Sequence, residues 1–238
     1  ILNVNITQKM RTRTILLQLA IVFTGLFFMS SDGCAPTGPV MAVIHTDYGD
    51  MIIELSDSTP EHRDNFVKLV NEGFYNDLLF HRVMKGFMIQ CGDPKSRDAE
   101  PGVKLGSGGP GYTLESDFRA DHLHVYGSIA AARKPDNVNP EKRSSGSQFY
   151  IVQGSTYKPG ELASMENRVQ AVAPDFTYSD EAKVLYNELG GTPFLDMNYT
   201  VFGRVVVGME TIDSIANVKV MRGNRPNEDV RFSIEILK

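Results

Sequence analysis

Short runs of hydrophobic residues recur along the chain from residue 40 onward, separated by segments rich in Gly, Pro, Asn and Asp. Runs of this length with such boundaries are typical of β-strands. They predict strands at residues 41–46, 51–55, 78–84, 87–91, 125–132, 147–152, 199–207 and 230–237. Helical spacing of hydrophobic residues is found at residues 59–73, 161–172, 178–189 and 209–216. The pattern predicts a mainly β fold, a closed or nearly closed barrel accompanied by helices.

One connection between predicted strands is much longer than a hairpin turn. Residues 154–192 separate the strands at 147–152 and 199–207, and they contain two of the predicted helices. The second helix runs into Gly190 and Gly191, and glycine is common directly after a helix. We therefore expect one domain at residues 40–238, with a helical pair inserted at about residues 154–192.

The first 33 residues have a different character from the rest of the chain. Lys9, Arg11 and Arg13 precede an apolar run at residues 15–29, and small and polar residues follow it. The run is shorter than the roughly 20 residues that a transmembrane helix needs. A basic start, an apolar stretch and a small-residue exit predict an export signal at residues 1–33. Met10 is a candidate for the true start of translation.

Cys34 follows this segment directly, after Gly33. The Gly-Cys pair resembles the end of a bacterial lipoprotein signal, which implies a lipid on Cys34 and a short tether at residues 34–39. An ordinary cleaved signal and an uncleaved anchor are the alternatives. The other cysteine, Cys91, lies in an apolar run and is expected to be a buried small side chain.

Composition narrows the possible functions. The 238 residues carry a formal net charge of −5, and no basic run contains interleaved aromatic residues, which argues against a nucleic-acid binder. A glycine-rich segment at residues 106–111 is followed by no Lys-Ser or Lys-Thr, so a tight loop is favoured over a phosphate site. The histidines show no convincing metal-ligand spacing, and we expect no metal.

The strongest candidate for chemistry is Arg82. It lies in the apolar strand predicted at residues 78–84, where a permanent charge is unfavourable without a partner, a ligand or solvent. Gln90 interrupts the next strand in the same way. A structural ion pair is the alternative for Arg82, and His81 is expected to be structural rather than a base.

Several motifs occur together in an order that resembles the cyclophilins. They are residues 80–82 (FHR), 86–90 (GFMIQ), 108–112 (GGPGY), 146–149 (GSQF) and 200–203 (TVFG). The resemblance runs from about residue 40 to residue 238, except for the insertion. It implies a cyclophilin-like closed eight-stranded antiparallel barrel capped by two helices, peptidyl-prolyl cis/trans isomerase activity and no cofactor.

The resemblance also implies roles for individual residues. Arg82 would be the catalytic guanidinium, and Gln90 would hold the substrate backbone. The expected substrate-binding residues are Phe87, Met88, Tyr150 and Leu195 around the proline ring, with Ala130, Gln148, Phe149, Phe194 and Tyr199 around the groove. For Leu195 a place in the core is an equal alternative. Tyr150, Phe194 and Tyr199 differ from the residues of well-known members, which puts sequence preference in question more than catalysis.

The leading hypothesis is an exported prolyl isomerase that assists protein folding in the cell envelope. Its partners would be proline-containing polypeptides and, through the lipid on Cys34, a membrane; we expect a monomer. A second hypothesis is a proline-peptide binding module in which the inserted helices supply a partner surface. A purely structural envelope lipoprotein would explain neither Arg82 nor Gln90.

Overall fold

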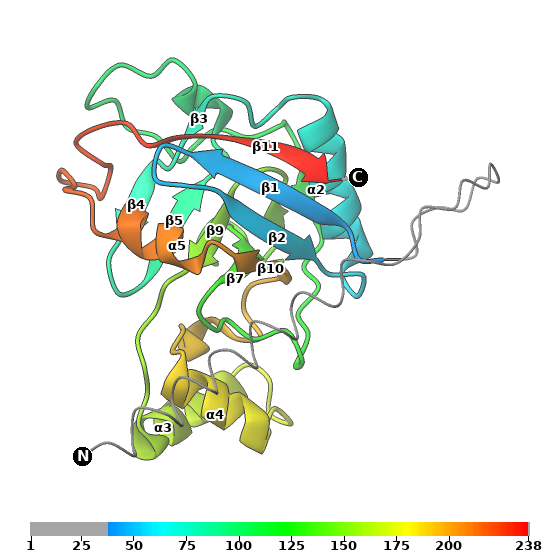
Figure 1. The fold of residues 1–238 in the computed structure, drawn as a ribbon. Coiled ribbons are helices and arrows are strands. Elements are labelled where there is room, and N and C mark those ends of the chain that lie inside the picture. The colour runs from blue at the N-terminus through cyan, green and yellow to red at the C-terminus, as the bar shows by residue number, and fades with distance from the viewer. Residues whose placement is uncertain (1–37, 238) are drawn as a thin grey trace, which may run out of the picture. The chain divides into compact units, whose positions relative to one another are not determined.

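This computed structural model describes residues 38–237. The main element of these residues is an antiparallel sheet. Its nine strands are β1 (Met41–Thr46), β2 (Met51–Leu55), β3 (Leu78–Leu79), β4 (Arg82–Met84), β5 (Met88–Cys91), β7 (Ser128–Ala131), β9 (Phe149–Val152), β10 (Val201–Val207) and β11 (Arg231–Leu237). They are ordered β3-β11-β1-β2-β10-β7-β9-β5-β4. Figure 1 shows that the sheet is strongly curled. The predicted mainly β fold is confirmed.

The two ends of the sheet order belong to one stretch of chain. β3 pairs with β11 and β4 pairs with β5, yet only Phe80 and His81 separate β3 from β4. The strand predicted at residues 78–84 is therefore divided between the two ends of the sheet. The sheet forms a curled half-barrel, and its closure into eight strands stays a prediction.

Two helices contact the sheet, as expected from the sequence. Helix α2 (Pro60–Asn71) contacts β10 and β11, and helix α5 (Met209–Ala216) contacts β4 and β5. Proline at the first position of α2 suits a helix start, because that position needs no backbone donor. The buried face of α2 contributes Phe66, whose ring lies 5.5 Å from that of Phe149 and 5.6 Å from that of Phe202. This aromatic cluster fills the core of the curled sheet.

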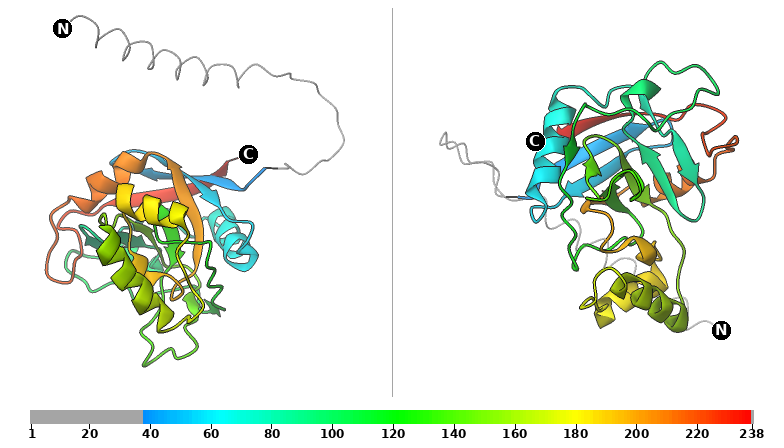
Figure 2. Two further views of the ribbon diagram at one scale, coloured as in Figure 1. Left: turned by 90° about the horizontal axis from the view of Figure 1, so that it is seen from below. Right: turned by 180° about the vertical axis from the view of Figure 1, so that it is seen from behind.

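The two helices predicted between residues 154 and 192 are present as α3 (Pro159–Gln170) and α4 (Asp180–Glu188). They lie side by side below the sheet (Figures 1 and 2). They have a small hydrophobic core of their own, which consists of Leu162, Val169, Phe176, Tyr178, Ala182 and Tyr186. A 3₁₀ turn, η2 (Pro193–Leu195), follows α4 and leads toward β10.

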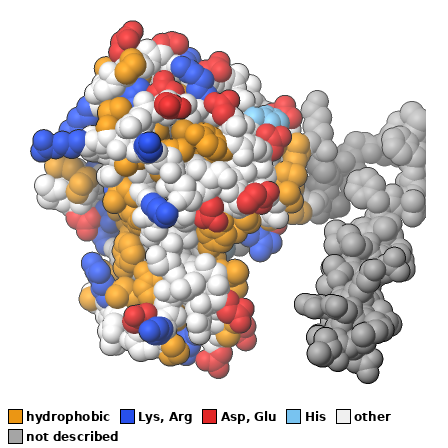
Figure 3. Space-filling model, turned by 60° about the vertical axis from the view of Figure 1, so that its left-hand side comes forward, with side chains coloured by type: hydrophobic (Ala, Val, Ile, Leu, Met, Phe, Trp, Pro, Cys, Tyr) orange, Lys and Arg blue, Asp and Glu red, His pale blue; other side chains and the backbone are white. Residues whose placement is uncertain are grey.

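Some short elements carry no hydrophobic period and were not predicted. These are the two-stranded sheet of β6 (Thr113–Leu114) and β8 (Ser144–Ser145), and the 3₁₀ turns η1 (Pro94–Ser96) and η2. The predicted signal peptide and Cys34 lie outside the described residues. Between residues 38 and 237, no helix has the length and apolar character needed to cross a membrane. On the face in Figure 3, acidic and basic side chains are interspersed among hydrophobic ones.

Candidate active site

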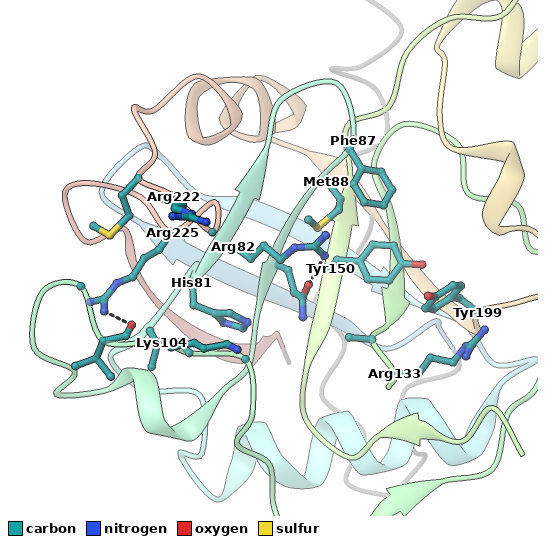
Figure 4. A pocket seen from close by; sticks show the side chains of 18 of the residues that line it. His81, Arg82, Phe87, Met88, Lys104, Arg133, Tyr150, Tyr199, Arg222 and Arg225 are labelled. Carbon is teal, nitrogen blue, oxygen red and sulfur yellow. Dashed lines mark hydrogen bonds between the residues drawn. The ribbon is translucent and has the colours of Figure 1, made fainter. Parts of the chain in front are cut away.

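A groove of about 580 Å³ lies next to β4 and β5. Figure 4 shows the side chains that surround it. It is lined by His81, Arg82, Phe87, Met88, Gln90, Gly102, Val103, Lys104, Leu105, Gly106, Ala132, Arg133, Tyr150, Leu195, Tyr199, Met221, Arg222, Gly223 and Arg225. Most of the residues predicted to act on a substrate are therefore brought to one place.

Backbone pairing explains how these residues meet. Directly opposite residues of paired strands point to the same face of a sheet. Arg82 is opposite Gln90, and Gln90 is opposite Tyr150. Tyr150 is in turn opposite Ala130, which is opposite Val201. One row across five strands thus carries the guanidinium, the amide and the apolar floor.

The next row of the sheet points to the other face. Phe149 is opposite Cys91 on β5 and Ala131 on β7, and all three side chains are buried in the main core. Phe149, which the resemblance places around the groove, therefore does not line it. The reason is the two-residue period of a strand, which turns Phe149 away from the face that Tyr150 occupies.

Arg82 is half-buried and faces the groove without an acidic partner. Its Nη1 donates a hydrogen bond to Oε1 of Gln90 over 3.0 Å, and its Nη2 lies 3.1 Å from the sulfur of Met84. Among the described residues, no carboxylate lies within ion-pair distance of its guanidinium. Burial lowers the pKa of Arg82 from its ordinary value, but a guanidinium remains protonated in proteins. The alternative, in which Arg82 forms a structural ion pair, is therefore not supported, because no described carboxylate pairs with it.

A chain of hydrogen bonds through the side-chain amide of Gln148 holds the Gln90 side chain in place. Its Nε2 donates to Oε1 of Gln148 over 3.1 Å, and Nε2 of Gln148 donates to the carbonyl oxygen of Gly108 over 2.7 Å. With both ends of the Gln90 amide engaged, its oxygen is held toward Arg82. Gln148 therefore supports the site through Gln90 and contributes nothing to the groove lining itself.

The glycine-rich loop is held by Asp93, which is fully buried. The carboxylate accepts hydrogen bonds from the backbone N–H groups of Gly106 and Gly108, over 2.6 and 3.2 Å. A Cβ atom at position 108 would lie only 2.0 Å from Oδ1 of Asp93, so glycine is required there. The loop is a tight structural turn, as predicted, and it presents the Gly108 carbonyl to Gln148.

An apolar cup lies beside Arg82, and we define it as Phe87, Met88, Tyr150, Leu195 and Tyr199. Met88 and Tyr150 are buried, and the other three are partly buried around them. Leu195 both packs against this cluster and lines the groove. The hydroxyl of Tyr150 is buried and has no hydrogen-bond partner among the described residues, and burial raises the pKa of that hydroxyl.

The remaining predicted residues lie close to the cup. Ala130 is completely buried beneath it, in contact with the same cluster. The ring of Phe194 lies 5.7 Å from that of Phe87, although Phe194 does not line the groove. Tyr199 is covered by Arg133, whose Cζ lies 4.5 Å from the centre of the tyrosine ring.

No pattern in the sequence points to Asp196, which supports the wall of the cup that Leu195 forms. Asp196 is buried and directly follows Leu195 in the chain. Its Oδ1 accepts hydrogen bonds from the backbone N–H and from Nδ1 of His124, both over 2.8 Å. Its Oδ2 accepts from the hydroxyls of Tyr178 and Tyr186, over 2.7 and 2.6 Å. Both tyrosines belong to the insertion, so the inserted helices are fastened to the wall of the cup.

A fixed guanidinium beside an apolar cup on a curled antiparallel sheet defines a cyclophilin-type site. The family model described as "Cyclophilin type peptidyl-prolyl cis-trans isomerase/CLD" matches residues 41–235. The chain therefore belongs to the cyclophilin-type peptidyl-prolyl cis-trans isomerases, and the predicted family and enzyme class are confirmed.

Individual relatives agree with this assignment. A protein of Staphylococcus saprophyticus named "Putative peptidyl-prolyl cis-trans isomerase" is 34% identical over 204 residues, which cover 84% of this chain and 92% of the relative. A relative of the same name from Staphylococcus aureus strain USA300 is 34% identical over 197 residues, 81% of this chain and 89% of the relative.

Solved structures support the fold. A Cryptosporidium parvum cyclophilin type peptidyl-prolyl cis-trans isomerase superposes with a TM-score of 0.60 at 22% identity, over 84% of this chain and 99% of that one. A second structure of that protein, in the presence of the dipeptide Ala-Pro, gives a TM-score of 0.58 at 23% identity, over 83% of this chain and 99% of that one.

Proposed function

We propose that this protein accelerates cis/trans rotation about X-Pro bonds in exported polypeptides and so assists protein folding in the cell envelope. The observation that carries the catalytic part is Arg82, which lacks an acidic partner among the described residues and is held by Gln90 beside the apolar cup. The dipeptide Ala-Pro that accompanies a structural neighbour supports proline-containing substrates.

The chemistry needs neither a nucleophile nor a proton transfer. Amide resonance keeps the X-Pro bond planar with a barrier of about 18–20 kcal/mol, while the cis and trans forms differ by only about 0.5–1 kcal/mol. In the half-rotated state resonance is lost, and the prolyl nitrogen gains a lone pair. A catalyst must therefore bind this twisted state more tightly than either planar state.

Arg82 can supply that preference. An N–H group of its guanidinium can donate to the prolyl nitrogen only once the lone pair has developed, so the interaction strengthens in the transition state. Partial burial makes such a hydrogen bond stronger than it would be in water. The bond to Gln90 fixes the guanidinium in advance, so little reorientation is needed during rotation.

The cup performs the complementary task of holding the pyrrolidine ring. Met88 and Tyr150 form its buried floor, and Phe87, Leu195 and Tyr199 surround it. With the ring fixed on one side of the bond, the carbonyl of the preceding residue is the part that rotates. We propose that Gln90 holds the substrate backbone through its second amide N–H, because only one N–H is used by Gln148.

The exported location rests on the sequence before residue 35. The basic residues, the short apolar run and Gly33-Cys34 support a signal peptide with a lipid on Cys34 as a membrane anchor. Beyond a short tether we propose a monomeric enzyme. In a bacterial host fed a labelled fatty acid, the wild-type chain should carry the label in the membrane fraction and the variant Cys34→Ala should not. An unlabelled, cytosolic wild-type protein would refute the anchor.

Closure of the barrel belongs to the same proposal. The stretch at residues 78–84 pairs with β11 at its beginning and with β5 at its end, so it joins both ends of the sheet order. Counted as one strand, β3 and β4 reduce the nine strands to eight.

The experiment that tests the activity compares three proteins on one proline-containing peptide. Wild type should accelerate isomerisation and Arg82→Ala should lose most of the acceleration. Arg204→Ala is the control, because Arg204 is exposed and pairs with Glu54 on β2, away from the groove. Equal rates for wild type and Arg82→Ala would refute the proposed mechanism.

The alternative of a partner-binding insertion has less support. The buried tyrosines of the insertion are committed to Asp196 and hence to the wall of the cup. Val184 and Leu185 are exposed hydrophobic residues of α4, and Val184 lines a hollow of about 220 Å³ with residues of α3, but no second observation points to a partner there. Deleting residues 154–192 would disturb the active site as well as any partner surface, so that deletion cannot separate the two functions.

A further inference from the structure

The groove extends beyond the cup, and its other half is basic. Figure 4 shows His81, Lys104, Arg222 and Arg225 on one side of Arg82, with the cup on the other side. The described residues that line the groove include five Lys or Arg and no Asp or Glu. The chain as a whole has 24 Lys and Arg against 29 Asp and Glu, so this one-sided lining is not a property of the general surface.

Two of these cations are already neutralised or engaged. Nη1 of Arg133 donates to Oδ1 of Asp136 over 2.5 Å. The Arg225 side chain is buried and donates to Oδ1 of Asp229 over 3.1 Å. Neither arginine therefore offers a full charge to a ligand.

Lys104 and Arg222 are different. Both are exposed, and within residues 38–237 neither side chain forms an ion pair or a hydrogen bond. Together with Arg82 they leave three uncompensated positive charges along one groove. We call Lys104 and Arg222 the cationic arm.

The cationic arm is built into the fold rather than carried by independent loops. Nη1 of Arg225 donates to the carbonyl oxygens of Glu100 and Val103, both over 2.9 Å, which fastens the loop of Lys104 to the loop of Arg222. The second loop is closed by a hydrogen bond from the N–H of Met221 to the carbonyl oxygen of Arg225 over 2.8 Å. The N–H of Val83 donates to the carbonyl oxygen of Asn224 over 2.8 Å, which ties this loop to the strand that carries Arg82.

We propose that the cationic arm binds an acidic side chain of the substrate polypeptide, close in sequence to the proline held in the cup. This inference rests on the proposed function, because it assumes that a peptide lies along the groove. An extended chain advances about 3.3 Å per residue, so a peptide anchored at the cup places its neighbouring residues along the rest of the groove. A carboxylate there would meet uncompensated positive charge with no competing acidic group in the lining.

The expected preference is moderate because the cations are exposed. An exposed ion pair is worth enough to change an affinity by up to about fivefold. Salt should weaken the preference, since screening acts strongly on exposed charges. The charge of the arm should also speed the encounter with acidic peptides.

The test uses peptides that contain one proline and an Asp at each of the three positions before or after it, each matched with a peptide that has Asn instead. Wild type is compared with the double variant Lys104→Gln/Arg222→Gln. The control is Lys68→Gln/Lys183→Gln, which removes the same charge from α2 and α4, outside the groove. Both kcat/KM for isomerisation and Kd for peptide binding are measured, at low and at high salt.

For wild type and the control we expect one or two adjacent positions at which Asp improves Kd and kcat/KM about fivefold over Asn at low salt. The preference should vanish in the Lys104/Arg222 variant, so that its Asp and Asn peptides give equal Kd and equal kcat/KM. An equal response to Asp and Asn, or a preference that survives in that variant, would overturn the proposal. Failure of the proposed function is a separate result, in which no peptide is isomerised, and Kd then still decides whether the arm binds acidic residues.

Discussion

Two sides of the active site are held in place by different means. Arg82, Gln90 and Tyr150 form one side, which we call the strand wall, and they are fixed by consecutive backbone pairings across β4, β5 and β9. Leu195 forms another side, which we call the turn wall, on a single 3₁₀ turn outside the sheet. That turn depends on Asp196, a buried carboxylate that accepts hydrogen bonds from His124, Tyr178 and Tyr186.

The difference shows how the insertion contributes to the enzyme. The strand wall needs only the sheet, whose hydrogen bonds are spread over many residues. The turn wall concentrates its support in one carboxylate whose donors come from distant parts of the chain. Substitutions around Asp196 should therefore affect stability and substrate binding strongly, while leaving the chemistry at Arg82 in place.

The largest effect is expected from Asp196→Ala. This change leaves the Tyr186 hydroxyl and both the backbone N–H and Nδ1 of His124 buried without an acceptor, and breaking such a buried polar pair costs about 3–5 kcal/mol. The loss is measured as the difference in the free energy of unfolding in urea between wild type and Asp196→Ala. Asp64→Ala removes an exposed carboxylate that pairs with Arg63 and is the matched control.

If Asp196→Ala unfolded at the same urea concentration as Asp64→Ala, the turn wall would not depend on the buried carboxylate. An isomerase activity that survived with unchanged KM would lead to the same conclusion.

Next to the strand wall, the buried His81 directly precedes Arg82 and should make stability depend on pH. Burial lowers the pKa of His81 to about 4, although the charge of Asp93 opposes the shift. The unfolded chain takes up this proton near pH 6.5 and the native protein only near pH 4, so stability falls as the pH drops through that range. The loss attributable to His81 is about 3 kcal/mol.

The contribution of His81 to the pH dependence of stability is tested by urea unfolding of wild type and His81→Gln between pH 4 and pH 8. His62, whose pKa burial also lowers to about 4, is present in both proteins, so their difference isolates His81. We expect the curve of the variant to be the flatter one below pH 6.5, with the two curves parallel above it. Parallel curves throughout would show that His81 is not held neutral by burial.

A smaller effect is expected from Tyr178→Phe and Tyr186→Phe. Each removes one hydrogen bond to Asp196 and should lower the free energy of unfolding by about 1–2 kcal/mol. Because the cup wall loosens while Arg82 is untouched, KM for a proline peptide should rise and kcat should stay close to that of wild type.

Tyr157→Phe is the control for these variants. Tyr157 also belongs to the insertion, and its ring lies 6.3 Å from that of Tyr186, but its hydroxyl makes no hydrogen bond to any described residue. A rise in KM for Tyr157→Phe as large as for Tyr186→Phe would mean that general loosening of the insertion, rather than the bond to Asp196, moves the wall.

The same contrast explains what the sequence could predict. The strand wall was predictable because hydrophobic runs mark strands, their period decides which side chains share a face, and Arg82 and Gln90 stand out within such runs. Within the strand wall, one residue was still misplaced. The two-residue period of β9 turns Phe149 into the core, whereas the motif at residues 146–149 suggested a place around the groove.

The turn wall and the cationic arm could not be predicted in the same way. Asp196 is recognisable only through donors from residues 124, 178 and 186, and no local pattern brings these together. Lys104 and Arg222 are ordinary exposed cations in sequence, and they share a groove only because Arg225 joins their loops. Contacts between distant loops depend on tertiary structure, which single-sequence patterns do not encode.

The most direct test of the catalytic account separates kcat from KM in Arg82→Lys. Lysine keeps the positive charge but lacks the planar fork that Gln90 holds in place. The account predicts that kcat falls by about 100-fold or more, the typical cost of losing one positioned donor, while KM changes little. An unchanged kcat, or a loss confined to KM, would show that Arg82 binds the substrate without stabilising the rotated bond.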